Sequence, residues 1–357
     1  MNELLNPLPV TVLGATGSVG QRFVQLLDGH PWFRVAALTG SERSVGRPYA
    51  EACRWILDTP MPTWAREMPV LPSDPQRLET SVIFSALPSE KARLLEPQFA
   101  RRGALVFSNA SAYRREPDVP ILMPEVNADH IHLLEVQRKQ RGWRGGIITN
   151  SNCTSAGLTV VLKALQDAFG VRRGFVVSMQ ALSGAGYPGV ASLDILDNVI
   201  PYIAGEEDKV EWEPRKMLGS LEQGSIHLAD FVLSAHANRV AVRDAHTLSL
   251  SVELGEAVSL EAVAAALKEY LPPEAARGLP STPRPVIALL DAPDRPQPRR
   301  DRWMGDGMTT VVGRLRPDPL FHVKMTVLSH NTVRGAAGGS IYNAELALRL
   351  GLMATLS

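Results

Sequence analysis

Residues 10–24 read VTVLGATGSVGQRFV, an apolar run that leads into three glycines and then into a helical pattern. Glycines at every third position, Gly14, Gly17 and Gly20, predict a tight turn between a strand and a helix. Such a turn lets backbone N–H groups approach a pyrophosphate, which then faces the positive end of the helix. We therefore expect a dinucleotide site formed by Gly14, Thr16, Gly17, Ser18, Val19 and Gly20. The alternative is a glycine-rich turn that only packs the helix on the strand.

Strand-like and helix-like segments alternate along residues 9–150. This alternation predicts a parallel, doubly wound sheet of the Rossmann type. Nucleotides bind at the carboxyl edge of such a sheet, where we expect Ser85, Ala86, Leu87 and Ser108 to lie. The expected strands cover residues 10–13, 34–38, 81–85, 105–108 and 121–123, and the expected helices cover residues 19–27, 90–102 and 127–141.

The pattern changes near residue 150. Residues 247–254 read TLSLSVEL and alternate polar with apolar side chains, as in a half-buried strand of a mostly antiparallel, mixed sheet. Further strands are expected over residues 174–182, 285–289, 309–315 and 320–328, with a helix over 258–270. We expect a Rossmann-type domain over residues 1–150 and a second α+β domain over 151–330. The alanine-rich segment 331–357 is expected to form a helix that returns to the first domain, or else caps the second.

The end of the second expected strand bears on the choice of dinucleotide. Residues 38–44 read LTGSERS, in which Ser41, Arg43 and Ser44 suit a 2′-phosphate. A carboxylate at the strand end would instead bind a 2′-hydroxyl, and Glu42 lies beyond that end. These residues favour NADP over NAD, although an exposed polar loop would look the same.

A second stretch carries a candidate nucleophile. Residues 147–158 read IITNSNCTSAGL, so Cys153 lies where an apolar strand gives way to a helix. The free N–H groups and the positive end of the helix dipole stabilise a thiolate. We therefore expect the pKa of Cys153 to fall below the free value of about 8.5. The alternative is a small buried cysteine with a structural role.

A nucleophilic thiol needs a partner that manages its proton. His246 directly precedes the alternating strand, and Arg239 lies seven residues before it. Arg239 would supply a planar fork for a substrate carboxylate. Both residues could equally be surface groups. The turn Ser183, Gly184, Ala185 and Gly186 follows another strand and would let a nicotinamide ring approach, unless it is an ordinary loop.

The whole chain sets further bounds. Its 357 residues suffice for two domains, and its 45% hydrophobic content is that of a globular protein. The formal net charge is zero, which argues against broad attraction to nucleic acid or an anionic membrane. The two cysteines, Cys53 and Cys153, are widely separated and do not show the spacing of a metal site. They indicate a reducing compartment. Without a visible secretory signal or an apolar run of about 18 residues, we expect a cytoplasmic enzyme.

Taken together, the motifs resemble those of the aspartate-β-semialdehyde dehydrogenase family, in its archaeal and fungal branch. The resemblance covers nearly the entire chain. It includes Arg239 with His246 and the segments GATGSVG (14–20), FSALP (84–88), SNAS (108–111), PEVN (124–127), TNSNC (149–153), QALSGAG (180–186), GEEDK (205–209), GDGM (305–308) and HNTVRGAAG (330–338).

The resemblance implies a role for each matching residue. Cys153 would form an acyl-thioester, His246 would act as acid and base, and Gln180 would lie beside the thiohemiacetal. The remaining matches would bind substrate or cofactor. Arg239 and Glu206 would grip the substrate's carboxylate and amino group, Arg114 and Lys209 the phosphate, and Asn331 the nicotinamide carboxamide. We also expect Asn152, with the Cys153 N–H, to bind substrate as an oxyanion donor.

Three departures from the family pattern stand out. Ser151 replaces a proline, Ala112-Tyr113 stands where Ser-His is frequent, and Ala245 replaces a glycine before the histidine. The second departure directly precedes Arg114. None of the three removes a group that the chemistry requires.

The family reaction is the NADPH-dependent reductive dephosphorylation of L-aspartyl-4-phosphate to L-aspartate 4-semialdehyde. It serves the biosynthesis of lysine (through diaminopimelate), threonine, methionine and isoleucine, in homodimers or homotetramers, with no metal. Alternatives on the same scaffold are malonyl-CoA reductase, the more remote N-acetyl-glutamyl-phosphate reductase, and a non-catalytic NADP-binding sensor. Glu206 favours a substrate with a free amino group, since an acetylated amine carries no positive charge to pair.

Overall fold

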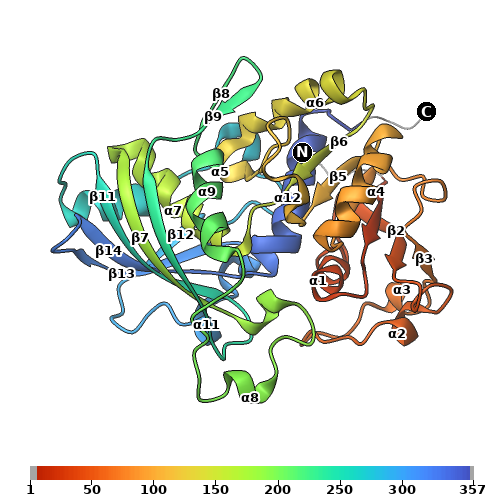
Figure 1. Cartoon of the computed structure of the whole chain (residues 1–357), viewed down its shortest axis with the longest axis horizontal. Coiled ribbons are helices and arrows are strands. Elements are labelled where there is room, and N and C mark those ends of the chain that lie inside the picture. The colour runs from red at the N-terminus through yellow and green to blue at the C-terminus, as the bar shows by residue number, and fades with distance from the viewer. Residues whose placement is uncertain (1–5, 354–357) are drawn as a thin grey trace.

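The computed structural model describes residues 6–353 as two six-stranded sheets with helices packed on them (Figure 1). The first sheet has the order β3-β2-β1-β4-β5-β6, and all its neighbouring strands are parallel. Its strands are β1 (Leu8–Leu13), β2 (Phe33–Gly40), β3 (Val70–Pro72), β4 (Val82–Ser85), β5 (Leu105–Ser108) and β6 (Gly146–Thr149). The helices of this half are α1 (Ser18–Leu26), α2 (Tyr49–Ala52), α3 (Thr63–Arg66), α4 (Ser89–Arg101), α5 (Pro124–Asn127) and α6 (Leu133–Arg141). Two 3₁₀ turns, η1 (Ser111–Tyr113) and η2 (Ala128–His132), complete it.

The glycine turn after β1 is tight for a steric reason. Gly14 has a φ of +70°, and a Cβ there would lie 2.8 Å from the carbonyl oxygen of Ala86. A Cβ on Gly20 would lie 2.2 Å from the carbonyl oxygen of Gly14. Only glycine therefore lets α1 start this close to the ends of β1 and β4. Phe23 of α1 stacks on Phe84 of β4, with ring centroids 5.0 Å apart, so this face of the helix packs directly on the sheet.

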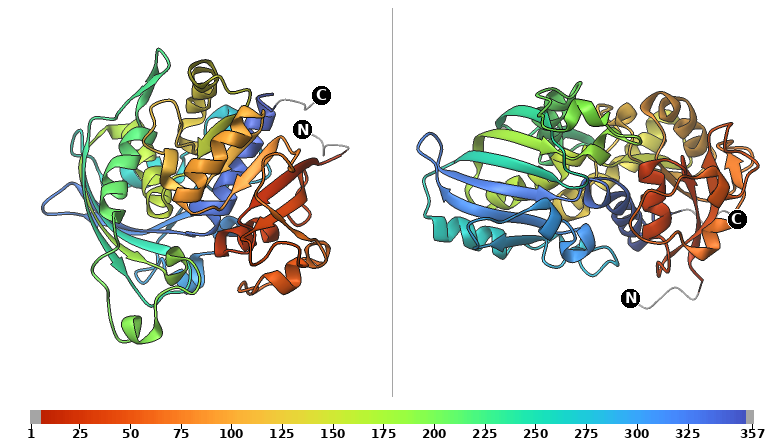
Figure 2. Two further views of the ribbon diagram at one scale, coloured as in Figure 1. Left: turned by 45° about the vertical axis from the view of Figure 1, so that its right-hand side comes forward. Right: turned by 90° about the horizontal axis from the view of Figure 1, so that it is seen from below.

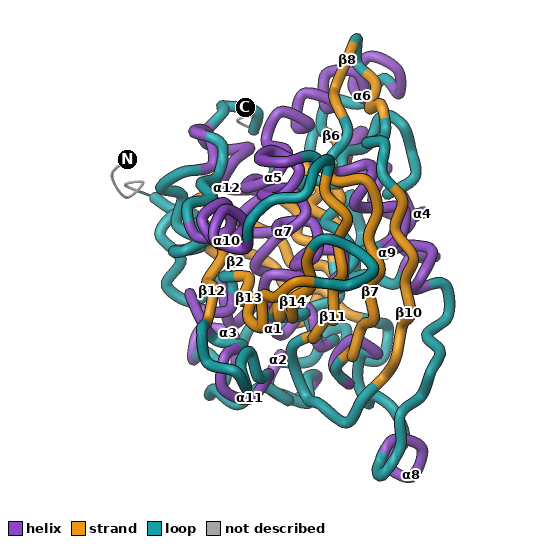
Figure 3. The backbone as a smooth tube through the Cα atoms, turned by 90° about the vertical axis from the view of Figure 1, so that its left-hand side faces the viewer, coloured by secondary structure: helices purple, strands orange, loops and turns teal. Residues whose placement is uncertain are grey.

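The second sheet is mixed and has the order β10-β7-β11-β14-β13-β12, which can be followed across Figure 3. Its two outer pairs are parallel and its three inner pairs are antiparallel. Its strands are β7 (Val171–Gln180), β10 (Val232–Arg239), β11 (His246–Leu254), β12 (Ile287–Leu290), β13 (Thr310–Pro317) and β14 (Val323–Ser329), and a separate hairpin joins β8 (Ser220–Glu222) to β9 (Ser225–His227). The helices are α7 (Cys153–Phe169), α8 (Ser192–Ile195), α9 (Glu206–Met217), α10 (Leu260–Lys268) and α11 (Pro298–Asp301), with 3₁₀ turns η3 (Leu182–Ala185), η4 (Glu274–Ala276) and η5 (Met304–Gly307).

The end of the chain crosses back to the first sheet. After β14 come a π-helical turn, η6 (Val333–Ala337), and the buried helix α12 (Gly338–Arg349). Ile341, Leu346 and Ala347 of α12 belong to the same apolar cluster as Phe84 and Phe107 of β4 and β5, and α12 lies against these strands (Figure 2). The expected helix thus ends at Arg349 within the described part of the chain, and residues 354–357 lie outside it.

Several expected elements differ from the structure. The strand expected over residues 121–123 is wrong: Ile121 makes only an isolated bridge to Thr149, because Pro120 and Pro124 flank it and lack N–H donors. The helix expected over 127–141 is split into η2 and α6. The short strand β3, the strand β10 and the length of α9 were not foreseen. Within residues 6–353 no helix is both long and apolar enough to span a membrane.

Candidate active site

A cleft of about 730 Å³ runs between the two sheets and collects most of the residues singled out in the sequence. From the first half of the chain it takes the start of α1, the turn after β4 and the loop after β5. From the second half it takes the start of α7, the turn η3, the start of α9 and the turn η6. The predicted residues that line it are Ser18, Val19, Ala86, Leu87, Arg114, Asn152, Cys153, Gln180, Ser183, Gly184, Ala185, Gly186, Glu206, Lys209, Arg239 and Asn331.

Cys153 lines this cleft and contacts His246, which is buried. Cys153 is the first residue of α7, and His246 is the first residue of β11. The Cys153 Sγ atom lies 3.1 Å from His246 Nε2. The backbone N–H of Ala181 donates to His246 Nδ1 at 3.0 Å. Because Nδ1 is thereby an acceptor, the proton of the neutral ring sits on Nε2 and faces the thiol.

The electrostatics of this pair correct one sequence-based expectation. Burial raises the pKa of Cys153 to about 12, and the carboxylate of Glu206 adds to the rise, against the opposing charges of Arg114 and Arg239. Burial also lowers the pKa of His246 to about 3. The expected lowering of the thiol pKa by the helix N-terminus is therefore wrong, because desolvation outweighs the helix dipole. The resting pair is a neutral thiol beside a neutral imidazole.

Asn152 holds the start of α7 in place. Its Oδ1 accepts from the backbone N–H groups of Thr154 and Ser155, at 2.8 and 3.2 Å, as an N-cap does. Its Nδ2 donates to Glu206 Oε1 at 2.8 Å. The amide oxygen and one of the two Nδ2 hydrogens are thus engaged, and the expected role of the side chain as an oxyanion donor stays a prediction for the second hydrogen. The backbone N–H of Cys153 faces the sulfur of the same residue.

Glu206 begins α9 and points into the cleft. Burial opposes its ionisation, but the hydrogen bond from Asn152 and the charge of Lys209 outweigh it, so its pKa is lowered. Lys209 Nζ lies 3.3 Å from Glu206 Oε2. The carboxylate is therefore charged at neutral pH and can pair with a substrate ammonium group.

Arg239 ends β10, and its Nη1 donates to the carbonyl oxygen of Ala181 at 2.6 Å. Gly184 lets it sit beside the imidazole: a Cβ on Gly184 would lie 2.9 Å from Arg239 Nη1 and 3.1 Å from His246 Cε1. The turn η3 needs a glycine at this position because the side chains of Arg239 and His246 both pack against it. Gln180, at the end of β7, lines the same part of the cleft and donates to Ser178 Oγ at 3.2 Å.

Arg114 lies at the side of the cleft that faces the first sheet. Its Nη1 donates to Glu213 Oε1 at 2.9 Å, and its Nη2 donates to the carbonyl oxygen of Asn109 at 2.9 Å. The guanidinium is buried yet borders the cleft, as does the more exposed ammonium group of Lys209. Two cations at this side form an arrangement that can bind a phosphate group.

Comparisons with known proteins agree with this geometry. Residues 9–134 match the family described as the semialdehyde dehydrogenase NAD-binding domain, and residues 162–334 match the semialdehyde dehydrogenase dimerisation domain. The chain is 52% identical over 340 residues to the aspartate-semialdehyde dehydrogenase of Archaeoglobus fulgidus, covering 95% of this chain and 98% of that protein. It is 47% identical over 352 residues to that of Schizosaccharomyces pombe, covering 96% and 99%.

The chain belongs to the aspartate-semialdehyde dehydrogenase family. A crystal structure of the Candida albicans aspartate-semialdehyde dehydrogenase with NADP superimposes with a TM-score of 0.89, at 42% identity, covering 96% of this chain and 99% of that one. The family assignment and the fold expected from the sequence are both confirmed.

Not every predicted cofactor residue of this family member borders the cleft. Gly14, Thr16, Gly17 and Gly20 form the turn behind Ser18 and Val19. Ser41 and Arg43 are exposed beyond the end of β2, whereas Ser44 is buried against Gly40. Ser85 and Ser108 are buried, and Ser108 Oγ donates to the buried carboxyl of Glu96 at 2.7 Å, so this hydroxyl is directed away from the cleft.

Asn331 connects the backbone before His246 with the turn η3. Its Oδ1 accepts from the N–H of Ala245 at 2.8 Å, and its Nδ2 donates to Ser183 Oγ at 2.8 Å. Ala245 has a φ of +82°, the left-handed region that favours glycine. This explains why the family pattern has a glycine at this position, and the bond from Asn331 holds the alanine there before His246.

Two residues that the sequence reasoning missed lie at the start of α7. Glu213 accepts hydrogen bonds from Arg114 and from the N–H of Asn152. Gly335, in η6, lies so close to Cys153 that a Cβ would come within 2.9 Å of the cysteine Cα and Cβ. The helical spacing of Glu206, Lys209 and Glu213 was a signal that could have identified the first residue. The second lies within the segment HNTVRGAAG (330–338), in which only Asn331 was given a role.

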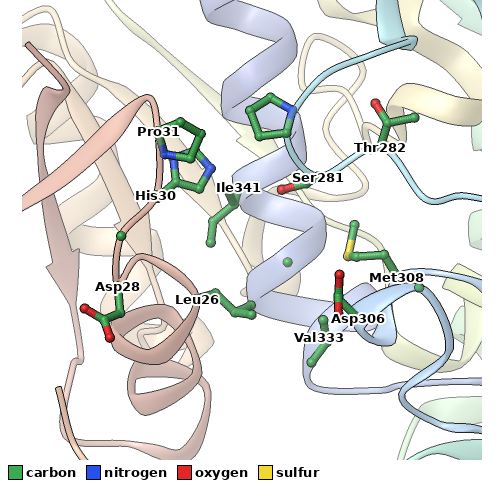
Figure 4. A pocket seen from close by; sticks show the side chains of 14 residues that line it. Leu26, Asp28, His30, Pro31, Ser281, Thr282, Asp306, Met308, Val333 and Ile341 are labelled. Carbon is green, nitrogen blue, oxygen red and sulfur yellow. The ribbon is translucent and has the colours of Figure 1, made fainter. Parts of the chain in front are cut away.

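The GDGM motif lies outside this cleft. It borders a smaller pocket of about 290 Å³ between the loop after α1, α12 and residues 280–282 (Figure 4). His30 Nε2 lies 3.0 Å from a buried Glu345 carboxylate, which also accepts from Ser281 Oγ at 2.6 Å. These bonds satisfy the carboxylate and tie the first domain to α12.

Proposed function

We propose that this chain catalyses the NADPH-dependent reductive dephosphorylation of L-aspartyl-4-phosphate to L-aspartate 4-semialdehyde. The observation that carries the proposal is the 3.1 Å contact between Cys153 Sγ and His246 Nε2 in a cleft that also holds Glu206 and Arg239. The assignment of individual roles to these residues is part of the proposal. It is supported by the family membership and by the placement of complementary charges.

Substrate binding follows from the charges of the cleft. Arg239 pairs with the α-carboxylate and Glu206 with the α-ammonium group, which selects an amino acid over malonyl-CoA or an acetylated substrate. Arg114 and Lys209 bind the acyl phosphate. The substrate carbonyl carbon is thereby brought to Cys153, and Gln180 lies beside the adduct that forms there.

The chemical steps involve Cys153 and His246 directly. The sulfur of Cys153 attacks the carbonyl carbon, and the thiol proton passes to the departing phosphate group, because Nε2 of His246 already carries a proton. The backbone N–H of Cys153 and the Nε2–H of His246 stabilise the tetrahedral oxyanion. Phosphate departs from the tetrahedral adduct, with its charge offset by Arg114 and Lys209, and a thioester remains on Cys153. After hydride addition to the thioester carbonyl, Nε2–H of His246 protonates the oxygen to give a thiohemiacetal. When the C–S bond breaks, the hydroxyl proton returns to His246 as the aldehyde forms, and the released sulfur takes a proton from water to restore the thiol.

The cofactor is proposed to be NADP, whose reduced form would supply the hydride. The steric demand for glycine at Gly14 and Gly20 fits a pyrophosphate-binding turn in front of α1. Ser18, Val19, Ala86, Leu87 and the turn 183–186 connect this place to Cys153 along one cleft. Ser41 and Arg43, exposed at the end of β2, are proposed to bind the 2′-phosphate, and Asn331 the carboxamide.

We further propose the domain division and the assembly. Residues 1–150, completed by 331–357, bind the cofactor, and residues 151–330 hold the catalytic groups and the dimer interface. The family description of residues 162–334 as a dimerisation domain supports a homodimer, from which a homotetramer can be built. A cytoplasmic location accords with the two free cysteines.

The test is phosphate-dependent reduction of NADP by aspartate semialdehyde, followed by absorbance, with malonyl-CoA as the competing substrate in the reverse direction. Cys153→Ala is expected to abolish turnover. His246→Asn is expected to retain a residue of activity, since acid–base assistance typically contributes about 10²–10⁴-fold. Near-normal rates for Cys153→Ala would refute the covalent route.

The proposed binding of the substrate α-carboxylate by Arg239 is tested by a separate variant. Arg239→Lys replaces a planar fork with a point charge and is expected to raise the KM for aspartate semialdehyde by about tenfold or more. The KM for NADP should not change. Unaltered kinetics of this variant would remove Arg239 from the substrate site.

A further inference from the structure

We propose that Glu213 is a positioning residue that sets the distance between the phosphate-binding side of the cleft and the nucleophile. The inference rests on the proposed function. It concerns a carboxylate that none of the sequence motifs included. Its two oxygens connect the guanidinium of Arg114 with the backbone directly before Cys153.

The contacts of Glu213 are short and shielded from water. Oε1 accepts from Arg114 Nη1 at 2.9 Å, and Oε2 accepts from the N–H of Asn152 at 2.6 Å. The side chains of Glu213 and Arg114 are only 2% and 8% exposed. A buried carboxylate that receives a donor on each oxygen is held firmly, because either bond, once broken, leaves an unpaired buried group.

The helix that carries Glu213 makes this bridge rigid. α9 lies beside α7, as Figure 1 shows, and Glu206 is on α9 as well. Lys216, three residues after Glu213, donates from Nζ to the carbonyl oxygens of Arg114, Glu116 and Val119 at 2.7, 2.7 and 2.8 Å. A single helix therefore carries the group that pairs with the substrate amine and also fixes the loop that carries Arg114.

Glu213 thus affects the positions of both the Cys153 sulfur and the Arg114 guanidinium. The Asn152 N–H bond fixes the bend that aims the Cys153 sulfur and N–H into the cleft. The Arg114 bond fixes where the phosphate sits. Because phosphate leaves from the carbon that the sulfur attacks, the separation of these two groups must be held to about half an ångström for efficient reaction. Glu213 spans that separation with one side chain.

A positioning role and a purely electrostatic role predict opposite changes. Glu213→Gln removes a negative charge next to Arg114, so a purely electrostatic effect would tighten phosphate binding. In the positioning role, the amide turns an N–H towards one of two donors, which releases Arg114 or Asn152. We expect the KM for phosphate to rise and kcat to fall, each by about tenfold or more, with the KM for NADP unchanged.

The matched control is Glu211→Gln on the same helix. Glu211 also accepts a backbone N–H, from Ala235 at 2.9 Å, but within residues 6–353 no hydrogen bond or ion pair joins it to Arg114 or Asn152. Its variant should remain within about twofold of the wild type in kcat and in the KM for phosphate. A KM for phosphate that falls or stays unchanged in Glu213→Gln, with kcat within about twofold of the wild type, would overturn the proposal.

Two further measurements keep the test decisive. If Glu213→Gln does not fold, Glu213→Asp keeps the charge and both acceptors but is one methylene shorter, so it must release one partner. Wild-type kinetics for Glu213→Asp would also overturn the proposal. If the wild type shows no phosphate-dependent activity, the proposed function fails, and iodoacetamide alkylation of Cys153 still reports on Glu213. The Glu213 variant should then change that rate by about threefold or more relative to Glu211→Gln, whereas an equal rate would refute the positioning role.

Discussion

Gly335→Ala tests whether the returning C-terminal segment shapes the nucleophile. In the wild type Gly335 of η6 faces Cys153 across a contact that leaves no room for a side chain. The added Cβ would lie 2.9 Å from Cys153 Cα and Cβ, whereas ordinary contact begins at 3.4 Å. Neither cysteine atom is the tip of a flexible side chain, so the backbone at the start of α7 or the turn η6 must move by about half an ångström.

The size of the effect follows from that shift. Overpacking of a buried site costs about 1–3 kcal/mol of stability. A misplacement of about 1 Å can cost about 10²-fold in rate, so we expect kcat to fall by about tenfold to 10²-fold, with smaller changes in the KM values. The assays are NADP reduction by aspartate semialdehyde with phosphate, thermal unfolding, and the alkylation rate of Cys153.

The control is Ala337→Gly in the same turn. Ala337 is buried in the apolar cluster of the first sheet, and its methyl group is removed rather than added. This variant should lose about 1 kcal/mol of stability, as glycine does in helices, while alkylation of Cys153 stays as in the wild type. If Gly335→Ala kept both kcat and the alkylation rate of the wild type, the close packing of η6 on Cys153 would not determine the position of the sulfur.

Three further predictions concern protonation and the buried ion pair. Alkylation of Cys153 by iodoacetamide in the ligand-free enzyme should accelerate by about tenfold per pH unit to beyond pH 9, because its pKa is raised to about 12 by burial; a plateau near neutral pH would instead show a preformed thiolate. Burial lowers the pKa values of His130, His246 and His330 below 6.5, so each stays neutral in the folded protein while the unfolded chain takes up a proton. The free energy of unfolding measured by urea titration should therefore be fully present above about pH 6.5. Below that pH it should decrease by up to about 1.4 kcal/mol per pH unit for each histidine, until the pKa of that histidine in the folded protein is reached; a flat profile would contradict the burial of these rings. Glu125→Gln should lower the free energy of unfolding by about 3–5 kcal/mol, because Arg334 Nε donates to Glu125 Oε1 at 2.6 Å in a fully buried pair; the exposed Glu135→Gln is the control, and equal losses in the two variants would show that the pair is not important.

Much of the fold and the composition of the site could be predicted from local patterns. The glycine turn at 14–20, the parallel strands β1, β4 and β5, and the start of α7 at Cys153 all depend on backbone sterics and short-range periodicity. The segment 121–123 failed because its flanking prolines remove the donors that a strand needs. The length of α9 was not expected from its charged sequence, and only the structure shows that Glu206, Glu213 and Lys216 are buried in polar contacts.

What the tertiary structure alone decided is how distant residues meet and how much water they exclude. Cys153 and His246 are 93 positions apart, and Arg114 and Glu213 are 99 apart, so no local period links them. The direction of the thiol pKa shift was predicted wrongly, because the sequence shows a helix N-terminus but not the desolvation around it. The sequence by itself determined which chemical groups this protein carries and where its chain turns. Their distances, partners and protonation states came from packing, since desolvation and close contact depend on every element around the site and not on the neighbours in the chain.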